Sequence, residues 1–400
     1  MVEKQVDILI IGGGLTGATL MLALKGLGFS TLLVESKPFS DKVDPDFDAR
    51  TLALSLASVR ILDMLGIWAP LQQHATAIET IHVSNQHYFG ASRLQNDATT
   101  PLGYVVEMQH INQTLHNLLD KSAVLAPATL KALDQTKQVA TVLTDSGTVH
   151  IQAQLIVAAD GAESAVRQLC ALPVTVKNYQ QQAVVANIGL AKSHGNRAFE
   201  RFTAHGPLAM LPMQGPRMAL VWAMPPEDAR QMMAASDAHF LKALQGDFGY
   251  RLGRLVKVGQ RFVYPLKQAL MPQQVSWPLV FVGNAAHTLH PVAGQGFNLG
   301  LRDVATLAQC IAQQGLSAAM LTEYMQLRRH DQQMITHLTD GLIQLFTSRI
   351  PGVGLMRNMG LMAFDNLPSL KHLFARYALG FGGLVPDLAC EIALKTREQE

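Results

Sequence analysis

The chain has 400 residues, of which 48% are hydrophobic and 16% charged, and its 32 basic and 30 acidic residues give a net charge of +2. This length predicts two domains, the apolar content excludes general disorder, and the lack of a long Lys/Arg run gives no sign of a nucleic-acid partner. The three cysteines are far apart and form no C-x-x-C motif, which favours reduced thiols in a cytoplasmic protein over a zinc or redox site.

The N-terminal segment predicts a strand, a glycine turn, a helix and a second strand. Residues 8–11 and 31–34 are apolar runs typical of buried parallel strands, and a helix is expected over residues 15–27, with Gly28 as its end. The turn has the G-x-G-x-x-G spacing that brings backbone N–H groups to a pyrophosphate, and its expected contacts are Gly12, Gly14, Leu15, Thr16 and Gly17. Glu35 follows the second strand, where a carboxylate can bind a ribose diol. The pattern predicts a dinucleotide site but does not separate FAD from NAD.

A second turn follows the apolar run 155–158. Asp160 and Gly161 begin the pattern D-G-x-x-S-x-V-R, which ends at Arg167. Taken alone, Asp160 is interpreted as the cap of a helix that starts near Ala162. The complete pattern is more specific than a cap, and it indicates a second ligand-binding turn at the end of a strand.

A third turn follows the apolar run 279–282 and reads GNAAHTLHPVAGQGFN, with a helix expected from about Asn298. Its glycines allow the main chain to approach a flat ring. His287 and His290 have a spacing compatible with metal ligands, but no nearby Cys or carboxylate completes the set, and no nucleophile motif supports a catalytic histidine dyad. The turn is therefore interpreted as a cradle for a planar cofactor.

Together the three motifs resemble those of the aromatic-ring hydroxylases, the flavoprotein monooxygenases related to p-hydroxybenzoate hydroxylase. The resemblance implies that the first motif holds the ADP half of FAD, with Asp160 near the pyrophosphate, Arg50 and Pro291 near the flavin ring, and Gln109 touching FAD. The third motif implies contacts to the flavin and its ribityl chain from Gly283, Asn284, Pro291, Gly294, Gly296 and Asn298, with Asn284 where the family usually has Asp. No side chain is assigned as a catalytic residue.

Several stretches narrow the resemblance to the ubiquinone-biosynthesis hydroxylases, among them ERFTAHGPLAMLPM at residues 200–213. The C-terminal stretches 337–346 and 360–374 look most like the 2-octaprenyl-6-methoxyphenol hydroxylases. This resemblance implies that bound FAD, transient NAD(P)H and dioxygen hydroxylate the ring of a polyprenyl phenol through a flavin hydroperoxide. Two alternatives stay open: an FAD-dependent oxidoreductase or reductase acting on another hydrophobic or phenolic substrate, and a non-catalytic FAD-bound scaffold.

The order of the segments predicts an α/β fold in which a Rossmann-like FAD-binding domain with a parallel sheet is interrupted. We expect residues 1–172 and 273–330 to form this domain, residues 173–272 to form an antiparallel-sheet substrate domain with one helix over 227–244, and residues 331–400 to form helices. These C-terminal helices are expected either to pack on the core or to face lipid or a partner, peripherally at the inner membrane. A multi-enzyme ubiquinone-biosynthesis assembly and a homo-oligomer remain open.

Overall fold

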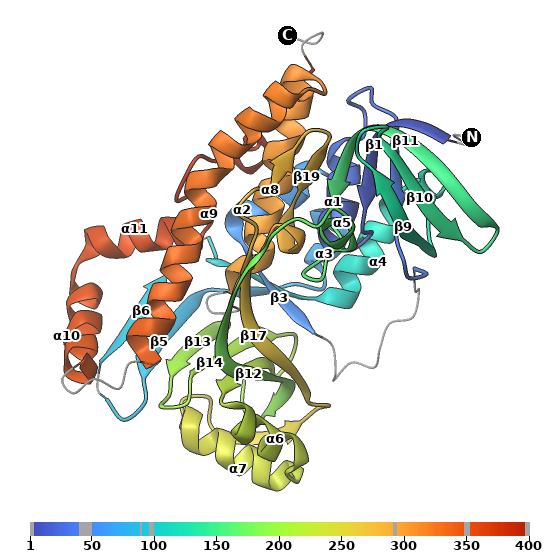
Figure 1. The fold of residues 1–400 in the computed structure, drawn as a ribbon. Coiled ribbons are helices and arrows are strands. Elements are labelled where there is room, and N and C mark those ends of the chain that lie inside the picture. The colour runs from blue at the N-terminus through green and yellow to red at the C-terminus, as the bar shows by residue number, and fades with distance from the viewer. Residues whose placement is uncertain are drawn as a thin grey trace.

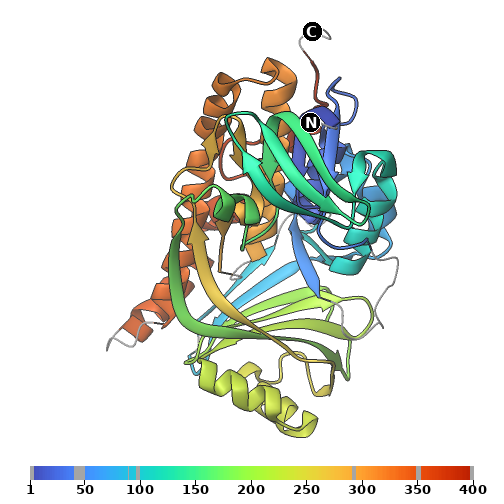
Figure 2. The same cartoon turned by 45° about the vertical axis from the view of Figure 1, so that its right-hand side comes forward.

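A computed structural model of the chain describes residues 4–39, 50–88, 90–95, 100–290, 294–347 and 353–396. Two large sheets organise the molecule, as Figures 1 and 2 show, with most of the long helices on one side of them. The mixed α/β class, with one largely parallel and one largely antiparallel sheet, confirms the prediction from the order of the motifs.

The first sheet has a parallel centre that brings three strand ends to one edge. Its order is β18-β19-β11-β1-β2-β8, and β10 and β9 extend it beside β11. Ile11 lies beside Ala158, and Ala158 lies beside Phe281, so the chain leaves these three strands at the same level. The strands are β1 Lys4–Ile11, β2 Thr31–Val34, β8 Val124–Leu125, β9 Ala128–Asp134, β10 Val139–Thr144, β11 Gly147–Ala158, β18 Val275–Ser276 and β19 Leu279–Phe281.

Helices cover this sheet. They are α1 Leu15–Ala23, α2 Leu56–Met64, α3 Trp68–Gln72, α4 Met108–Leu118, α5 Ala165–Leu169, α8 Gln295–Gln314 and α9 Ala318–Thr347. All of them except α5 share one apolar core with β1, whereas Val166 of α5 packs in a second core. The predicted end of the first helix, at residue 27, is wrong: α1 ends at Ala23, because Gly26 and Gly28 turn the chain with φ of +83° and +82°.

The helix after the second turn also begins later than predicted. It starts at Ala165 rather than near Ala162, because the Ser164 hydroxyl, not Asp160, is its cap and accepts a hydrogen bond from Arg167 N at 3.1 Å. The third predicted helix, expected from about Asn298, begins at Gln295 as α8, with Gly294 as its cap in the left-handed conformation.

The second sheet is antiparallel except at one pair. Its order is β20-β17-β12-β15-β14-β13-β5-β6, with β16 beside β12. The parallel pair β13–β5 joins residues 80–95 to the strands of the 173–272 segment. The bounds are β5 Thr80–Asn85, β6 Ala91–Gln95, β12 Thr175–Leu190, β13 Arg197–Phe202, β14 Pro207–Met213, β15 Arg217–Met224, β16 Leu255–Val258, β17 Phe262–Leu270 and β20 His287–Thr288.

Two short helices cover the outer face of this sheet, where one had been predicted over residues 227–244. They are α6 Pro226–Ala234 and α7 Asp237–Phe248. The single-helix prediction is wrong because Ser236 interrupts it, and its hydroxyl caps α7 by accepting from His239 N at 3.3 Å. Side chains from alternate positions of the strands, such as Leu208, Met210 and Trp222, pack against these helices in one cluster. The other positions of the same strands are thereby turned to the opposite face.

A small sheet and the C-terminal helices complete the fold. The small sheet contains β3 Thr51–Ser55, β4 Thr76–Ile78 and β7 Gly103–Glu107. The helices α10 Val353–Asn366 and α11 Pro368–Ala378 lie beside β6, at the left of Figure 1. Short 3-10 turns in the described part of the chain are Lys121–Ala123, Gly283–Ala285 and Asp387–Cys390. Within the described residues, no helix has the length and apolar composition that crossing a bilayer requires.

Candidate functional site

The three sequence motifs meet at the edge where β1, β11 and β19 end. Gly12 follows Ile11, Ala159 follows Ala158, and Gly283 comes two residues after Phe281. Since the strands end in register, the three turns become neighbours. In the sequence, about 150 residues separate the first turn from the second, and about 120 separate the second from the third. The edge of an open parallel sheet is where α/β proteins bind nucleotides, because the helices that follow point their N-termini at it.

Two glycines of the first motif are needed for packing within the protein. A Cβ on Gly12 would lie 2.5 Å from the Ala159 carbonyl oxygen, and a Cβ on Gly17 would lie 1.9 Å from the Gly12 carbonyl oxygen. Gly14, between them, is different: a Cβ there would meet no atom within 4 Å. The space in front of Gly14 is therefore open to a ligand, at the N-terminus of α1 where backbone N–H groups are free.

Polar atoms around this open space are arranged to hold a nucleotide. Glu35 is fixed beside the turn, since its Oε2 accepts from Gly13 N at 2.7 Å and its Oε1 from Lys37 N at 2.9 Å. Asp160 Oδ2 accepts from Val166 N at 3.1 Å, while Asp160 Oδ1 is buried and has no partner in the described part of the chain. A buried acceptor without a partner is rare in a protein alone, and it fits a site that a bound group completes.

The third turn is held against the first two by close packing. A Cβ on Gly283, where φ is +57°, would lie 2.8 Å from the Thr16 hydroxyl oxygen of α1. Arg167 of the second motif is buried and donates from Nη1 to the Ala285 carbonyl at 3.1 Å. The residues Gly161 and Gly296 face open space, with no atom within 4 Å of a built Cβ. The three turns thus form one cradle with room in front of it, and these residues fit FAD.

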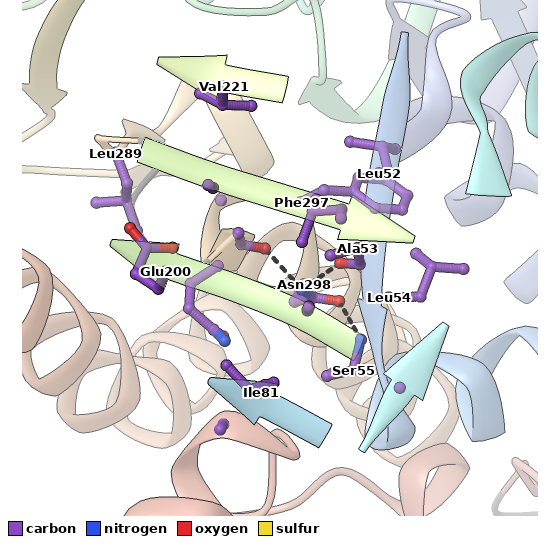
Figure 3. A pocket seen from close by; sticks show the side chains of 18 of the residues that line it. Leu52, Ala53, Leu54, Ser55, Ile81, Glu200, Val221, Leu289, Phe297 and Asn298 are labelled. Atoms are coloured by element: carbon purple, nitrogen blue, oxygen red, sulfur yellow. Dashed lines mark hydrogen bonds between the residues drawn. The ribbon is translucent and has the colours of Figure 1, made fainter. Parts of the chain in front are cut away.

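Asn298 connects the start of α8 to the small sheet. Its side-chain Oδ1 accepts from Ser55 N at 2.9 Å and from Ser58 Oγ at 2.7 Å. Its Nδ2 donates to the carbonyl oxygens of Ala53 at 2.9 Å and Gly294 at 2.8 Å. Figure 3 shows Asn298 between the β3 residues and the rest of the cavity. Four hydrogen bonds from one buried amide therefore set the position of Gly294 and the N-terminus of α8.

A buried charge network lies behind the third turn. Asp303 is fully buried; its Oδ2 lies 2.5 Å from His287 Nε2 and accepts from Gly283 N at 3.2 Å, and its Oδ1 accepts from Arg328 Nε at 2.8 Å. Asp331 bridges Arg328 and Arg302 at 2.8 and 2.7 Å. Burial alone would raise the pKa of Asp303, but the charges of His287 and Arg328 and their hydrogen bonds hold it well below the usual range. His287 thus supports the turn through its hydrogen bond with Asp303.

The cradle opens into a large apolar cavity of about 1110 Å³. One wall is the inner face of the antiparallel sheet, a second is the cofactor cradle, and a third comes from α9, α10 and α11. Figure 3 shows the first wall with Glu200 and Ile81 on the neighbouring strands β13 and β5, and with Val221 on β15, beyond β14. Representative lining residues are Leu52, Ile81, Ala209, Leu211, Val221, Leu289, Phe297, Leu342, Phe364 and Phe374. Segments LAMLPM (208–213) and VWAM (221–224) thus contribute to the apolar wall through Ala209, Leu211 and Val221.

Glu200 interrupts this apolar surface. Among the described residues that line the cavity it is the one ionisable side chain. It is half-buried because the cavity in front of it is open, yet protein surrounds its carboxyl group, and burial raises the pKa of Glu200 to about 7. The residues that face its carboxyl group, Ala209 and Val83 in the adjoining strands, are apolar. Sequence reasoning did not single out Glu200, and only the strand alternation A-F-E-R-F hinted that it shares a face with Ala198 and Phe202.

The predicted cofactor residues divide into two groups by position. Those that line the cavity are Gly14, Leu15, Thr16, Gly283, Asn284, Gly294, Gly296 and Asn298. Those that hold the turns in place behind it are Gly12, Gly17, Glu35 and Asp160. The structure does not bring the remaining ones to the cavity lining: Arg50 is exposed, with its carbonyl accepting from Met108 N, and Gln109 Nε2 donates to Glu107 at 2.9 Å. Pro291 lies outside the described residues.

Three glycine turns at one edge of a parallel sheet, beside an apolar cavity, define an α/β protein that binds a dinucleotide cofactor. The sequence matches the FAD binding domain family over residues 5–338, and the chain belongs to this family. FAD is accordingly its cofactor, and the predicted resemblance to flavoprotein hydroxylases is confirmed.

Comparisons with individual proteins agree with the family. The chain is 37% identical to the ubiquinone hydroxylase UbiL of Rhodospirillum rubrum, over 96% of this chain and 92% of that protein. It is 32% identical to the 3-demethoxyubiquinol 3-hydroxylase of Escherichia coli, over 95% of this chain and 100% of that protein. The crystal structure of p-nitrophenol 4-monooxygenase PnpA from Pseudomonas putida superposes with a TM-score of 0.77 at 17% identity, covering 95% of this chain and 99% of that one. This last likeness establishes the fold.

Proposed function

We propose that this protein is an FAD-dependent monooxygenase that hydroxylates the aromatic ring of a polyprenyl phenol in ubiquinone biosynthesis, with NAD(P)H and dioxygen as co-substrates. The observation that carries the proposal is the apolar cavity of about 1110 Å³ that runs from the cofactor cradle to the C-terminal helices. A phenol ring fits beside the cradle, and an apolar tail fits between Leu342, Phe364 and Phe374. The names of the two relatives above, both ubiquinone-pathway hydroxylases, support the same substrate class.

The chain holds FAD through its turns and the N-termini of two helices. The α1 N-terminus at Gly14 would bind the pyrophosphate, and Glu35 would bind the adenosine ribose. Asp160 Oδ1, the buried acceptor without a protein partner, would accept a hydrogen bond from the cofactor. The α8 N-terminus, held by Asn298, would direct its partial positive charge toward the flavin ring. When bound, FAD supplies the passage of electrons from NAD(P)H to dioxygen and the insertion of one oxygen atom.

The protein supplies orientation and a dry site. Leu52, Leu211, Val221 and Phe297 keep water from the reacting ring, which protects a reactive oxygen species from loss to solvent. Arg50, Gln109 and Pro291 remain proposed flavin neighbours. We retain residues 1–172 and 273–330 as the proposed FAD-binding domain and 173–272 as the proposed substrate domain, to whose sheet residues 80–95 add two strands.

The C-terminal helices offer a surface for a lipid-borne substrate. Met359 is 61% exposed, Leu367 52% and Leu373 53%, and all three lie on α10, α11 or the residue between them, next to the cavity-lining Phe364 and Phe374. We infer that this surface rests on the headgroup region of the inner membrane, with the protein on the cytoplasmic side, so that a polyprenyl phenol enters the cavity from lipid. A multi-enzyme assembly and a homo-oligomer are further proposals, which cross-linking in cells tests.

Product analysis tests the proposed function. The purified FAD-loaded protein is incubated with 2-geranylphenol, NADPH and labelled ¹⁸O₂. We expect a product heavier than the substrate by one ¹⁸O atom, and NADPH oxidation that the phenol stimulates. A gain of two hydrogen atoms would instead identify a reductase. Absence of both turnover and phenol-stimulated NADPH oxidation, with NADH and NADPH alike, would leave the non-catalytic scaffold.

A further inference from the structure

A single carboxyl group faces the apolar cavity from the middle of its wall. Glu200 lies on β13 between Ala198 and Phe202, which line the same cavity, and Figure 3 shows its carboxylate directed into the space between the sheet and Leu289. No hydrogen bond or ion pair of this carboxyl group occurs within the described residues. A lone carboxyl group in an apolar surrounding lowers stability, so its presence in the wall of a cavity that the cofactor cradle also lines points to a role in binding or chemistry.

The charged groups near Glu200 are turned away or already paired. Strand alternation places His82 of β5, Arg93 of β6 and Arg197 of β13 on the opposite face of the sheet, where they line a separate small cavity. Arg201 donates to the Asp247 carbonyl on α7 at 2.7 Å. On the remaining elements around the cavity, the ionisable groups have partners of their own: His287 with Asp303, His290 against the Tyr179 ring, Asp340 with Lys177, and Asp365 with Lys371.

We propose that the Glu200 carboxylate accepts the hydrogen bond of the substrate's phenolic hydroxyl group and takes up its proton as the ring is hydroxylated. This inference rests on the proposed function and names the residue that recognises the phenol. The chemistry of the cavity supports it, because a phenol is an apolar ring with one strong donor, and Glu200 is the complementary acceptor in an otherwise apolar surface. An ether or a hydrocarbon ring would leave the carboxylate buried without a partner.

The proton transfer balances with ring hydroxylation. As ring π electrons form the new bond between carbon and oxygen, the phenolic O–H bond breaks and its electron pair becomes the C=O bond of a cyclohexadienone. The proton passes to the Glu200 carboxylate. Loss of the hydrogen on the attacked carbon as a proton restores the aromatic ring as a dihydroxybenzene, and the Glu200 carboxylic acid returns its proton to the ring oxygen. The oxygen atom comes from dioxygen, whose O–O bond breaks as the new C–O bond forms, and its second oxygen atom leaves as water. NAD(P)H and one proton from solution supply two electrons and two hydrogens, which together with the proton lost from the attacked carbon complete the new hydroxyl group and the water.

A binding experiment tests recognition without turnover. Dissociation constants of 2-geranylphenol and of its methyl ether are measured on the FAD-loaded protein, without NADPH, by quenching of flavin fluorescence. At a pH of about 8 the wild type is expected to bind the phenol at least about tenfold more tightly than the ether, the effect of one hydrogen bond to a charged group. Glu200→Leu is expected to remove the preference, Glu200→Gln to keep part of it, and the exposed control Glu227→Gln to leave it unchanged.

A pH profile tests proton uptake. The kcat/KM of the wild type for the phenol is expected to rise with pH through about 7, where the carboxyl group ionises. Glu200→Gln is expected to lower kcat/KM at least about 100-fold and to flatten this rise, with its FAD content and melting temperature unchanged. Because Gln has the shape of Glu, it carries the test even if Glu200→Leu loses FAD. Wild-type rates and pH dependence in Glu200→Gln, together with an unchanged preference for the phenol, would overturn the proposal.

The two proposals fail in different ways. If the wild type hydroxylates the phenol and Glu200→Leu does so equally well, the proposed function stands and the role of Glu200 is rejected. If the wild type prefers the phenol to the ether through Glu200 but makes no hydroxylated product, the proposed function and the proton step are rejected together, while the hydrogen bond to the ligand stands.

Discussion

Substitutions of Gly14 and Gly17 separate loss of the cofactor from loss of the fold. At Gly14 the backbone has φ of −70°, which any residue adopts, and a new Cβ meets no protein atom within 4 Å. We therefore expect Gly14→Val to fold, with a loss of unfolding free energy of no more than about 1 kcal/mol from the poorer helix cap. Its side chain would occupy the space that we assign to the FAD pyrophosphate.

The magnitude of the FAD defect follows from the hydrogen bonds at stake. A pyrophosphate displaced from the α1 N-terminus loses at least two hydrogen bonds to a charged group, each worth about 1.5–3 kcal/mol. The dissociation constant of FAD in Gly14→Val should therefore rise by about 100-fold or more. Gly17→Ala is the contrast: its Cβ would lie 1.9 Å from the Gly12 carbonyl oxygen, so the helix must move and the apoprotein should lose about 1–3 kcal/mol of stability.

Two assays of the purified variants decide the outcome: FAD affinity by titration of apoprotein, and unfolding of apoprotein in urea. We expect Gly14→Val to be colourless and stable, and Gly17→Ala to be less stable than the wild type. If Gly14→Val bound FAD with the affinity of the wild type, the phosphates would not lie at the α1 N-terminus, and the cradle as described would be incorrect. If it failed to fold as an apoprotein, the open space at Gly14 would have been misjudged.

Three further predictions concern the supports of the site. Asp303→Asn should lower the unfolding free energy by about 3–5 kcal/mol, because Arg302 and Arg328 would then share Asp331 as their one buried carboxylate, and one positive charge would stay uncompensated. The pKa of Asp303 is lowered in the folded state, so the wild type should keep this contribution above the usual carboxyl pKa and lose it as pH falls toward the lowered pKa. A urea-stability profile that is equally steep in acid for both proteins would refute the assignment. Asn298→Ala should lower the unfolding free energy by at least about 1–3 kcal/mol and weaken FAD binding, because Ser55 N and the Gly294 carbonyl lose their partner. The exposed control Gln73→Ala should change neither the unfolding free energy nor the free energy of FAD binding by more than about 0.5 kcal/mol. The double variant Met359→Glu/Leu373→Glu should bind vesicles of phosphatidylethanolamine and phosphatidylglycerol about tenfold more weakly than the wild type, as measured by co-sedimentation. The control Tyr250→Glu, at a residue 76% exposed on the loop after α7, should bind them as the wild type does. Equal binding by the double variant and the control would exclude α10 and α11 as the membrane contact.

The cofactor cradle could be predicted from the sequence because its parts are local. A strand, a glycine turn, a helix and a second strand follow one another within the first 35 residues, and the physical demands on Gly12, Gly14 and Gly17 are set by the backbone of that one unit. The same holds for the turns at Asp160 and Gly283, since each follows its own apolar strand. The helix ends were less certain: Ser164 and Ser236 decide two of them, because a short hydroxyl side chain competes for backbone donors.

Long-range contacts were decided by the tertiary structure alone. The parallel pairing of β5 with β13 brings residues 80–95 into the second sheet. The local sequence pattern of neither strand identifies the other as its pairing partner. Asp303 belongs by sequence to a helix, yet it holds Gly283, His287 and Arg328 together. Alternation along β13 determines that Glu200 and Arg201 face opposite sides, but it cannot say which side is a cavity. Only the packing of the sheet against the cradle and the C-terminal helices leaves Glu200 alone among apolar side chains, because the dielectric around a carboxyl group depends on neighbours from every part of the chain.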